Sequence, residues 1–188
     1  MYSRSLLSAL AVAFAVPAMA APATSWTVDK AHSRLAFVAS MNGQAINGSF
    51  RRFDARIAFD PANLAGSSVV AVIDTGSVAT GDQTRDEALP SADWFNVTLF
   101  PRATFSARTF KSLGGGRYQA IGTLSIRGKN HPVAMPFQLV IKGTVAQMRG
   151  TVTIDRRWFG VGQGQFATPD AVAANVKVNV ALAARKAG

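Results

Sequence analysis

The amino-acid sequence predicts an all-β domain of about eight antiparallel strands, closed either as a sandwich or as a barrel. Two observations predict this class. Apolar and polar residues alternate with a period of two over most of the chain. Turn signals such as Asn42-Gly43, Gly114-Gly115-Gly116 and Lys142-Gly143 separate the alternating segments. Because these connections are short, neighbouring strands are expected to run antiparallel.

Length and composition indicate one domain that needs no covalent cross-link. The chain has 188 residues, of which 48% are hydrophobic, and it contains no cysteine. A chain of this length can bury a sizeable core without disulfides or a structural metal. The lack of cysteine excludes thiolate catalysis, Cys-ligated zinc and iron–sulfur chemistry. The formal net charge of +10 suggests nucleic acid, anionic lipid or an acidic ligand as partner.

Residues 1–20 are predicted to be a cleaved secretory signal peptide. Arg4 supplies a positive start, residues 6–16 are apolar, and Pro17 precedes an Ala18-Met19-Ala20 cleavage site. The apolar run falls well short of the roughly 20 residues that a membrane-spanning helix requires. We therefore expect a mature domain of residues 21–188 in the periplasm, where nucleic acid is not an expected partner.

Seven alternating segments are expected to form strands with one buried face. The clearest cover residues 131–142 and 175–185. Asn47-Gly48 and Asp60-Pro61 are interpreted as turns beside the earlier segments. In chain order, the inward-facing residues are Leu35 and Phe37; Phe53, Ala55, Ile57 and Phe59; Val69, Ala71 and Ile73; Tyr118, Ala120, Gly122, Leu124 and Ile126; Val133, Met135, Phe137, Leu139 and Ile141; Val152 and Ile154; and Val176, Val178, Val180 and Leu182.

One region, residues 82–93, lacks the alternation. Its residues before Pro90 are compatible with a helix, which predicts a long crossover containing a short helix. Asp93-Trp94-Phe95 follows it and is expected to plug one end of the sheet structure.

The interior of such a domain can be solid or hollow. Eight-stranded barrels are just wide enough to be filled by side chains or to hold one small ligand. The inward face is rich in phenylalanine, and large flat rings can fill a core or line an elongated apolar cavity. Periodicity alone favours the filled core.

Six groups of short motifs, in order along residues 26–160, resemble those of the YceI family. They are Asp29-Lys30-Ala31-His32-Ser33; Gly48-Ser49-Phe50-Arg51-Arg52-Phe53; Ser77-Val78-Ala79-Thr80 with Arg85-Asp86-Glu87-Ala88-Leu89; Phe95 with Phe100-Pro101-Arg102-Ala103-Thr104-Phe105; Gly122-Thr123-Leu124-Ser125-Ile126-Arg127-Gly128 with Pro132-Val133; and Arg156-Arg157-Trp158-Phe159-Gly160. Trp94 and Ser125 depart from the family's usual Phe and Thr, and residues 163–166 follow no pattern that we can place.

The resemblance implies a lipocalin-like antiparallel β-barrel, exported from the cell, that binds a polyisoprenoid or another long-chain amphiphilic lipid inside the barrel. It therefore favours the hollow interior. We expect a periplasmic carrier of a polyisoprenoid or isoprenoid quinone, with no cofactor and no enzymatic step. The residues expected to line the apolar cavity are Phe37, Phe50, Phe53, Phe59, Phe105, Leu124, Met135, Phe137 and Phe159.

Four polar residues are expected at the mouth of the cavity. Arg85 and Asp86 lie on the irregular crossover, where barrel loops gather, although they could instead form a local ion pair that caps the short helix. Arg156 shares the inward parity and could face a phosphate or quinone oxygen, or could turn to solvent at a strand end. His32 is interpreted as a polar contact for a lipid headgroup or as a structural group at the rim.

Residues for other chemistries are not arranged in known patterns. The two histidines, His32 and His131, have no metal-ligand spacing, and no G-x-S-x-G nucleophile motif occurs. Gly160-x-Gly162-x-Gly164 is not a dinucleotide fingerprint and is interpreted as a flexible turn. No catalytic residue and no metal site are therefore expected.

Two alternatives stay open. One is an enzyme that acts on an envelope lipid or small ester through a cluster of His32, Arg85 and Asp86. The other is a solid-cored protein that binds anionic surfaces by charge alone. Basic residues are spread along the chain and are interpreted as a solvated surface in peripheral contact with anionic membrane, and the oligomeric state could be monomer or homodimer. Among these basic residues are Arg51, Arg52, Arg108, Lys111, Arg117 and Lys142.

Overall fold

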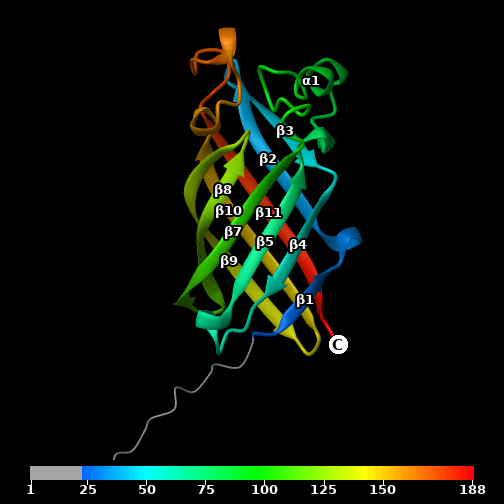
Figure 1. The fold of residues 1–188 in the computed structure, drawn as a ribbon, viewed down its shortest axis with the longest axis vertical. Coiled ribbons are helices and arrows are strands. Elements are labelled where there is room, and N and C mark those ends of the chain that lie inside the picture. Colours follow the sequence, from blue (N-terminus) through cyan, green and yellow to red (C-terminus); the bar gives the residue numbers. More distant parts are fainter. Residues whose placement is uncertain (1–22) are drawn as a thin grey trace, which may run out of the picture.

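The computed structural model describes residues 23–188, and the predicted signal peptide lies outside this range. Eight antiparallel strands form a closed ring, because the last strand pairs with the first (Figure 1). This confirms the predicted antiparallel barrel of about eight strands. In order around the ring, the strands are β1 (Ser25–Val28), β4 (Phe53–Ala58), β5 (Ser68–Asp74), β7 (Arg102–Gly114), β8 (Arg117–Ile126), β9 (Lys129–Lys142), β10 (Val145–Asp155) and β11 (Asn175–Lys186).

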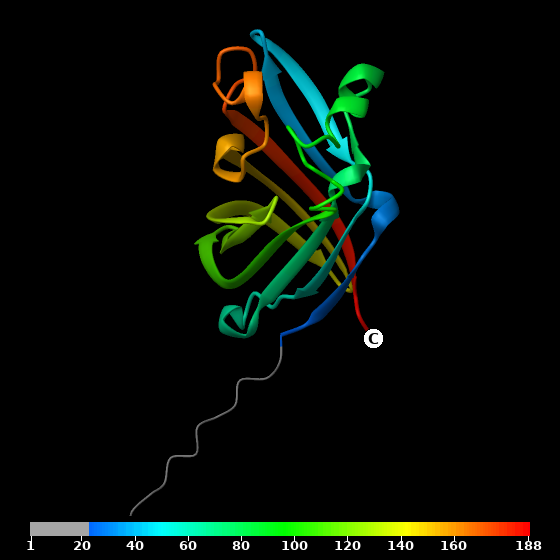
Figure 2. The ribbon, with the colours of Figure 1, turned by 45° about the horizontal axis from the view of Figure 1, so that its top comes forward.

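Three further strands extend the wall above β1. The strand β11 is long enough to pair with β1 through Ala184–Lys186 and with β2 (Arg34–Met41) through Lys177–Ala181. Next to β2 lie β3 (Gln44–Phe50) and then the two-residue strand β6 (Val78–Ala79). These strands rise beyond the ring at the end of the barrel that carries the long loops (Figure 2). We call this end, drawn at the top of Figure 1, the upper end, and the end with the two chain termini of the described part the lower end.

One predicted turn is wrong for a packing reason. Asn47 and Gly48 lie inside β3, and Gly48 is directly opposite Phe37 on β2. A Cβ atom at position 48 would collide with the ring of Phe37. The glycine therefore makes room for an aromatic ring of the neighbouring strand rather than a bend.

The strand β7 was not among the predicted segments, because its alternation is interrupted. Its pairing with β8 shifts register between Ala107 and Thr109, so that Arg108 is an extra residue in the ladder. A bulge of this kind reverses the parity of the residues that follow. The inward residues are consequently Phe105 before the bulge and Phe110 after it.

The predicted crossover contains one short α-helix, α1 (Gln83–Ala88), as expected. The side chain of Asp82 caps it by accepting a hydrogen bond of 2.9 Å from the backbone N–H of Arg85. No helix of residues 23–188 is both long and apolar enough to cross a membrane. Short 3-10 helices complete the fold: η1 (Lys30–His32), η2 (Leu64–Gly66), η3 (Thr75–Ser77), η4 (Arg156–Phe159) and η5 (Gly164–Phe166).

Candidate functional site

The barrel encloses an apolar cavity of about 300 Å³. Every strand of the ring contributes inward-facing side chains to its lining, and so do β2 and β3. Among the described residues that line it, all are apolar except Ser68 and Arg156. The cavity is therefore suited to bind a hydrocarbon chain, and its lining has almost no hydrogen-bond partners for a polar group.

All nine residues that the sequence predicted for the cavity wall are found in its lining. They come from six different strands, from the residue that follows β4 and from η4 after β10, so they surround the space rather than forming one patch. They are Phe37, Phe50, Phe53, Phe59, Phe105, Leu124, Met135, Phe137 and Phe159.

The lower end of the cavity is filled by aromatic rings. Phe59 is only 6% exposed, and its ring packs edge-on against Phe110, Tyr118 and Phe137 at centroid distances of 5.3, 5.4 and 5.9 Å. Trp26 is anchored beside them by a hydrogen bond of 2.9 Å from its Nε1 to the backbone carbonyl of Phe59. Edge-to-face packing at these distances is favourable beyond simple burial. The rings close this end of the barrel.

Toward the upper end, large side chains face small ones and leave space. Ala55 pairs with Ala71, which in turn lies opposite Phe105 on β7. Phe37 and Phe105 point inward but are only half-buried, because their inner faces border the cavity. In a solid core these rings would be covered on all sides. The interior is therefore hollow at this level because these rings do not reach across it.

Two loops cover the upper end and together form what we call the lid, residues 89–97 and 156–173. Leu89, Trp94 and Phe95 of the first loop line the cavity, as do Phe159, Val161 and Val172 of the second. The ring of Trp94 also packs on Phe166 of the second loop at a centroid distance of 4.9 Å. The prediction that Trp94 and Phe95 close one end of the barrel agrees with this position.

Backbone atoms of the two lid loops are bound to one another through Arg127 of the β8–β9 turn. Its Nη1 donates hydrogen bonds of 2.6 Å to the carbonyls of both Trp94 and Gly160. The backbone N–H groups of Gly162 and Gln163 each donate to the carbonyl of Asp93 at 2.8 Å. One side chain and one carbonyl thus hold the loops in fixed relation.

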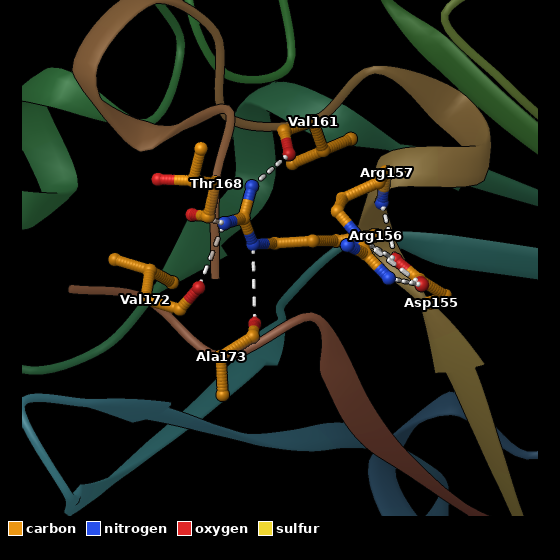
Figure 3. Close-up of polar contacts among 7 residues, drawn as sticks. All are labelled: Asp155, Arg156, Arg157, Val161, Thr168, Val172 and Ala173. Atoms are coloured by element: carbon orange, nitrogen blue, oxygen red, sulfur yellow. Dashed lines mark hydrogen bonds and ion pairs between the residues drawn. The ribbon is translucent and has the colours of Figure 1, made fainter. Parts of the chain in front are cut away.

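Arg156 fastens the second loop to the barrel (Figure 3). The residue is 3% exposed, and its guanidinium lies among backbone carbonyls. Nη1 donates to Val161 at 2.8 Å, Nη2 to Val172 at 2.7 Å and to Thr168 at 3.0 Å, and Nε to Ala173 at 3.1 Å. These bonds connect the start and the end of the loop to one planar group.

The charge of Arg156 is not neutralised by the neighbouring carboxylate. Asp155 instead forms an ion pair of 2.6 Å with Arg157 on the outer surface (Figure 3). Burial lowers the pKa of Arg156 below its usual value, although an arginine remains charged in proteins. Both sequence-based interpretations of Arg156 are corrected: its donors bind the backbone rather than a ligand headgroup, and the side chain is buried rather than turned to solvent.

Gly162 is required where the loop passes the guanidinium. It has a φ of +83°, and a Cβ atom there would collide with Nη1 of Arg156. Gly160 and Gly164 also have positive φ values. The three glycines, interpreted from the sequence as a flexible turn, therefore let the backbone of this loop pass around the buried guanidinium of Arg156. Their positive φ values favour glycine at each position.

A model of the YceI-like domain matches residues 26–184. The chain belongs to the YceI family. A UPF0312 protein of Vibrio cholerae is 30% identical over 161 residues, which cover 81% of this chain and 85% of the relative. A UPF0312 protein of Yersinia enterocolitica is 34% identical over 146 residues, covering 76% of each.

Solved structures of similar proteins have the same fold. BcnA of Burkholderia cenocepacia is similar with a TM-score of 0.80 and 31% identity, over 83% of this chain and 98% of BcnA. A domain of Saccharophagus degradans, described as a polyisoprenoid binding domain implicated in plant cell wall breakdown, is similar with a TM-score of 0.67 and 17% identity, over 87% of this chain and 99% of that domain. The family resemblance read from the motifs is thereby confirmed.

Three residues of the family motifs, His32, Arg85 and Asp86, lie outside the cavity of this YceI-family barrel. The side chain of His32 is 75% exposed on η1, where Nδ1 lies 3.0 Å from Asp29. Asp86 accepts hydrogen bonds of 2.7 Å from both the backbone N–H and the hydroxyl of Thr80, and these bonds lower the pKa of its carboxyl. Arg85 donates from Nε to the same Thr80 hydroxyl at 3.2 Å.

None of these three residues lines the cavity, so the structure does not assemble the predicted polar mouth from them. Asp86 and Arg85 instead tie α1 to the end of β6. The alternative of an ion pair between them that caps the helix is wrong, because Arg85 pairs with Asp82 at 3.5 Å and Asp82 is the cap. Within residues 23–188, no group of three or more His, Asp or Glu side chains is placed to hold a metal ion.

Sequence reasoning missed Arg127 and Leu89 as parts of the lid. Arg127 has a positive φ of 50° at a tight turn, which is unusual for a residue other than glycine. Its position before Gly128 inside a family motif was the available signal. Its two carbonyl partners are 33 residues away on either side, so that no local pattern could have identified them.

Proposed function

We propose that this YceI-family protein holds one long-chain amphiphilic lipid, a polyisoprenoid or isoprenoid quinone, inside the barrel and carries it in the periplasm. The observation that carries the proposal is the apolar cavity, whose lining contains only two residues that are not hydrophobic. Membership of the YceI family and the fold shared with a domain described as polyisoprenoid-binding support it.

The physical basis of binding is burial of hydrocarbon. Each CH₂ group removed from water contributes about 0.8 kcal/mol. The cavity volume of about 300 Å³ is at the lower end of the range typical of small-molecule sites. We therefore expect a single narrow chain in contact with the nine aromatic and aliphatic residues named above, and a polar head that stays outside the apolar lining.

The enzymatic alternative lacks its cluster. It required His32 together with Arg85 and Asp86, whereas His32 lies on η1 beside Asp29 and the other two lie around Thr80. The solid-cored alternative does not account for the cavity. Binding by burial needs no covalent step, and the geometry supports it without further groups.

Native mass spectrometry of the protein purified from its own periplasm, followed by lipid extraction, tests the proposal. We expect one isoprenoid lipid or quinone per chain. A protein that is free of lipid, and stays so when such lipids are added, would refute the proposal.

Two matched variants localise the ligand to the cavity. Ala71→Phe narrows the cavity from the inner face of β5, and Val72→Phe places the same ring one residue later, off the cavity lining. We expect the first variant to lose at least nine-tenths of the bound lipid and the second to keep it. Thermal unfolding of both shows whether each remains folded. Equal retention by two folded variants would place the lipid elsewhere.

A further inference from the structure

The outer wall formed by β7, β8, β9 and β10 is strongly basic, and its single carboxylate, Asp155 at the end of β10, is paired with Arg157. The sequence contains no Asp or Glu from residue 94 to residue 154. These four strands are neighbours in the sheet. The basic residues of this stretch of sequence therefore lie on adjacent strands of one wall. The basic residues that the sequence suggested were scattered are in large part gathered here. Those of β7 to β10 are Arg102, Arg108, Lys111, Arg117, Lys129, Lys142 and Arg149.

Three arginines on this side of the barrel lie in one register row across five neighbouring strands. Arg117 of β8 is in register with Gln138 of β9, which is in register with Arg149 of β10. The row continues through Ala181 of β11 to Arg34 of β2. Directly paired residues point to the same face of a sheet, and this row has the parity opposite to that of the cavity lining. We call these three side chains the arginine row.

The spacing of the arginine row follows from sheet geometry. Adjacent strands lie about 4.8 Å apart, so each arginine is about 10 Å from the next along the row. All three side chains border one groove on the outer wall. The floor between Arg149 and Arg34 is only a methyl group, that of Ala181, so the guanidinium groups stand clear of their neighbours.

The arginine row lacks the carboxylate partners that surface arginines usually have. Within residues 23–188, neither Arg34 nor Arg149 takes part in an ion pair or a side-chain hydrogen bond, and Arg117 contacts only backbone carbonyls of its own hairpin at 3.4 and 3.5 Å. On the opposite side of the ring, Arg52 beside β4 is paired with Asp74 at 2.8 Å. Arg56 of β4 forms no ion pair with the described residues either. What distinguishes the arginine row is that its three charges without a carboxylate partner lie in register across neighbouring strands.

Exposed apolar side chains lie at the edge of the arginine row. Leu113, near the end of β7, is 47% exposed and borders the same groove. Val140, two residues after Gln138 on the same outer face of β9, is 45% exposed. Basic groups next to exposed aliphatic groups are the combination found on surfaces that rest at a lipid headgroup boundary.

We propose that the arginine row is the surface by which the protein docks on an anionic lipid bilayer. The regular row of cations is complementary to an array of lipid phosphates, and Leu113 and Val140 enter the interface beside it. A dissolved polyanion would satisfy the arginines but would leave the two aliphatic side chains in water, which is why a bilayer is the better partner. The inference does not depend on the cavity holding a lipid.

Vesicle flotation with matched charge variants tests this docking surface. The row variant carries R34Q, R117Q and R149Q, and the control carries R51Q, R52Q and R56Q near β4, so both lose three charges. Each arginine near an anionic surface contributes a roughly fivefold factor. We expect partitioning of the row variant onto vesicles of phosphatidylglycerol and phosphatidylcholine to fall by about 100-fold, and that of the control by less than fivefold. Equal losses would show that net charge alone drives binding and would overturn the assignment.

A second pair of measurements separates a bilayer from a dissolved polyanion. Leu113→Ser leaves the charge unchanged and should weaken vesicle binding by three- to tenfold at 0.5 M salt, where electrostatic attraction is screened. Inorganic polyphosphate should compete with vesicles only weakly. Full competition together with an unchanged Leu113→Ser variant would overturn the bilayer in favour of a dissolved partner. Neither result bears on lipid inside the barrel, so this surface and the proposed function fail independently.

Discussion

The two ends of the barrel interior are built from the same kinds of residue but are packed differently. At the lower end, Phe59 stands within 6 Å of three other aromatic rings, and the interior is filled. At the upper end, Phe37 and Phe105 face a glycine and an alanine across the strands, and the interior is open. Small residues lie beside large ones at both ends, as Ala120 lies beside Phe110 at the lower end. The comparison teaches that the interior is solid where rings from opposite sides of the barrel meet, as Phe59 and Phe137 do, and that the apolar character of each strand does not decide this.

The largest effect that tests this comparison is expected for ring removal at the lower end. Phe59→Ala should lower the free energy of unfolding by about 3 to 5 kcal/mol, because it leaves a void inside packed rings. Phe37→Ala should cost only about 1 to 2 kcal/mol, because one face of that ring already borders empty space. Urea denaturation measures both. Equal losses would mean that the upper end is packed as tightly as the lower end.

The lid gives a second contrast between the ends, because the upper end is closed by hydrogen bonds and the lower end by rings. Arg156→Met keeps the apolar stem but leaves several buried carbonyls without donors, so we expect a loss of about 3 kcal/mol or more. Arg157→Met, on the exposed neighbour, should leave the urea midpoint almost unchanged. Hydrogen exchange should show the loss concentrated in residues 156–173. An even loss of amide protection over the whole barrel would contradict the proposal that Arg156 holds the second lid loop in place.

The smallest expected effect is a response of the upper end to acid. The folded-state pKa of Asp86 is lowered by its hydrogen bonds from Thr80, so this carboxylate contributes stability above about pH 4 that is lost as the pH falls further. Near α1, the amide protection factors, which are corrected for the intrinsic exchange rate at each pH, should therefore decrease as the pH falls below about 4, before those of the lower end respond. Asp86→Asn should remove most of this pH dependence. If α1 and β1 lose protection together in the unmodified chain, Asp86 does not act locally.

Much of the fold could be predicted from the sequence because a period of two is a local signal. Alternation identified the inward residues of β4, β5, β9 and β11, and the absence of alternation identified the crossover with α1. The bulge at Arg108 hid β7, since one extra residue reverses parity. Gly48 was mistaken for a turn residue because its partner, Phe37, lies on another strand.

The residues of the site could be predicted only where strand alternation determines which way a side chain points. Parity and family resemblance together placed nine residues in the cavity wall correctly. The polar residues were misplaced because their surroundings are set by loops and not by strand alternation. Arg156 illustrates this difference: its inward parity was right, but the carbonyls that surround it belong to residues 161–173, whose course the sequence pattern did not reveal.

The division of β11 between two partners has a consequence for how the chain is made. This strand follows all the other described strands along the chain, and it joins β10 on one side to both β1 and β2 on the other. Until its twelve residues are available, no strand connects β10 to β1, and the ring stays open. Contacts between such distant parts of a chain form slowly. A growing chain of this design therefore remains an unclosed sheet until β11 is available to join its two edges.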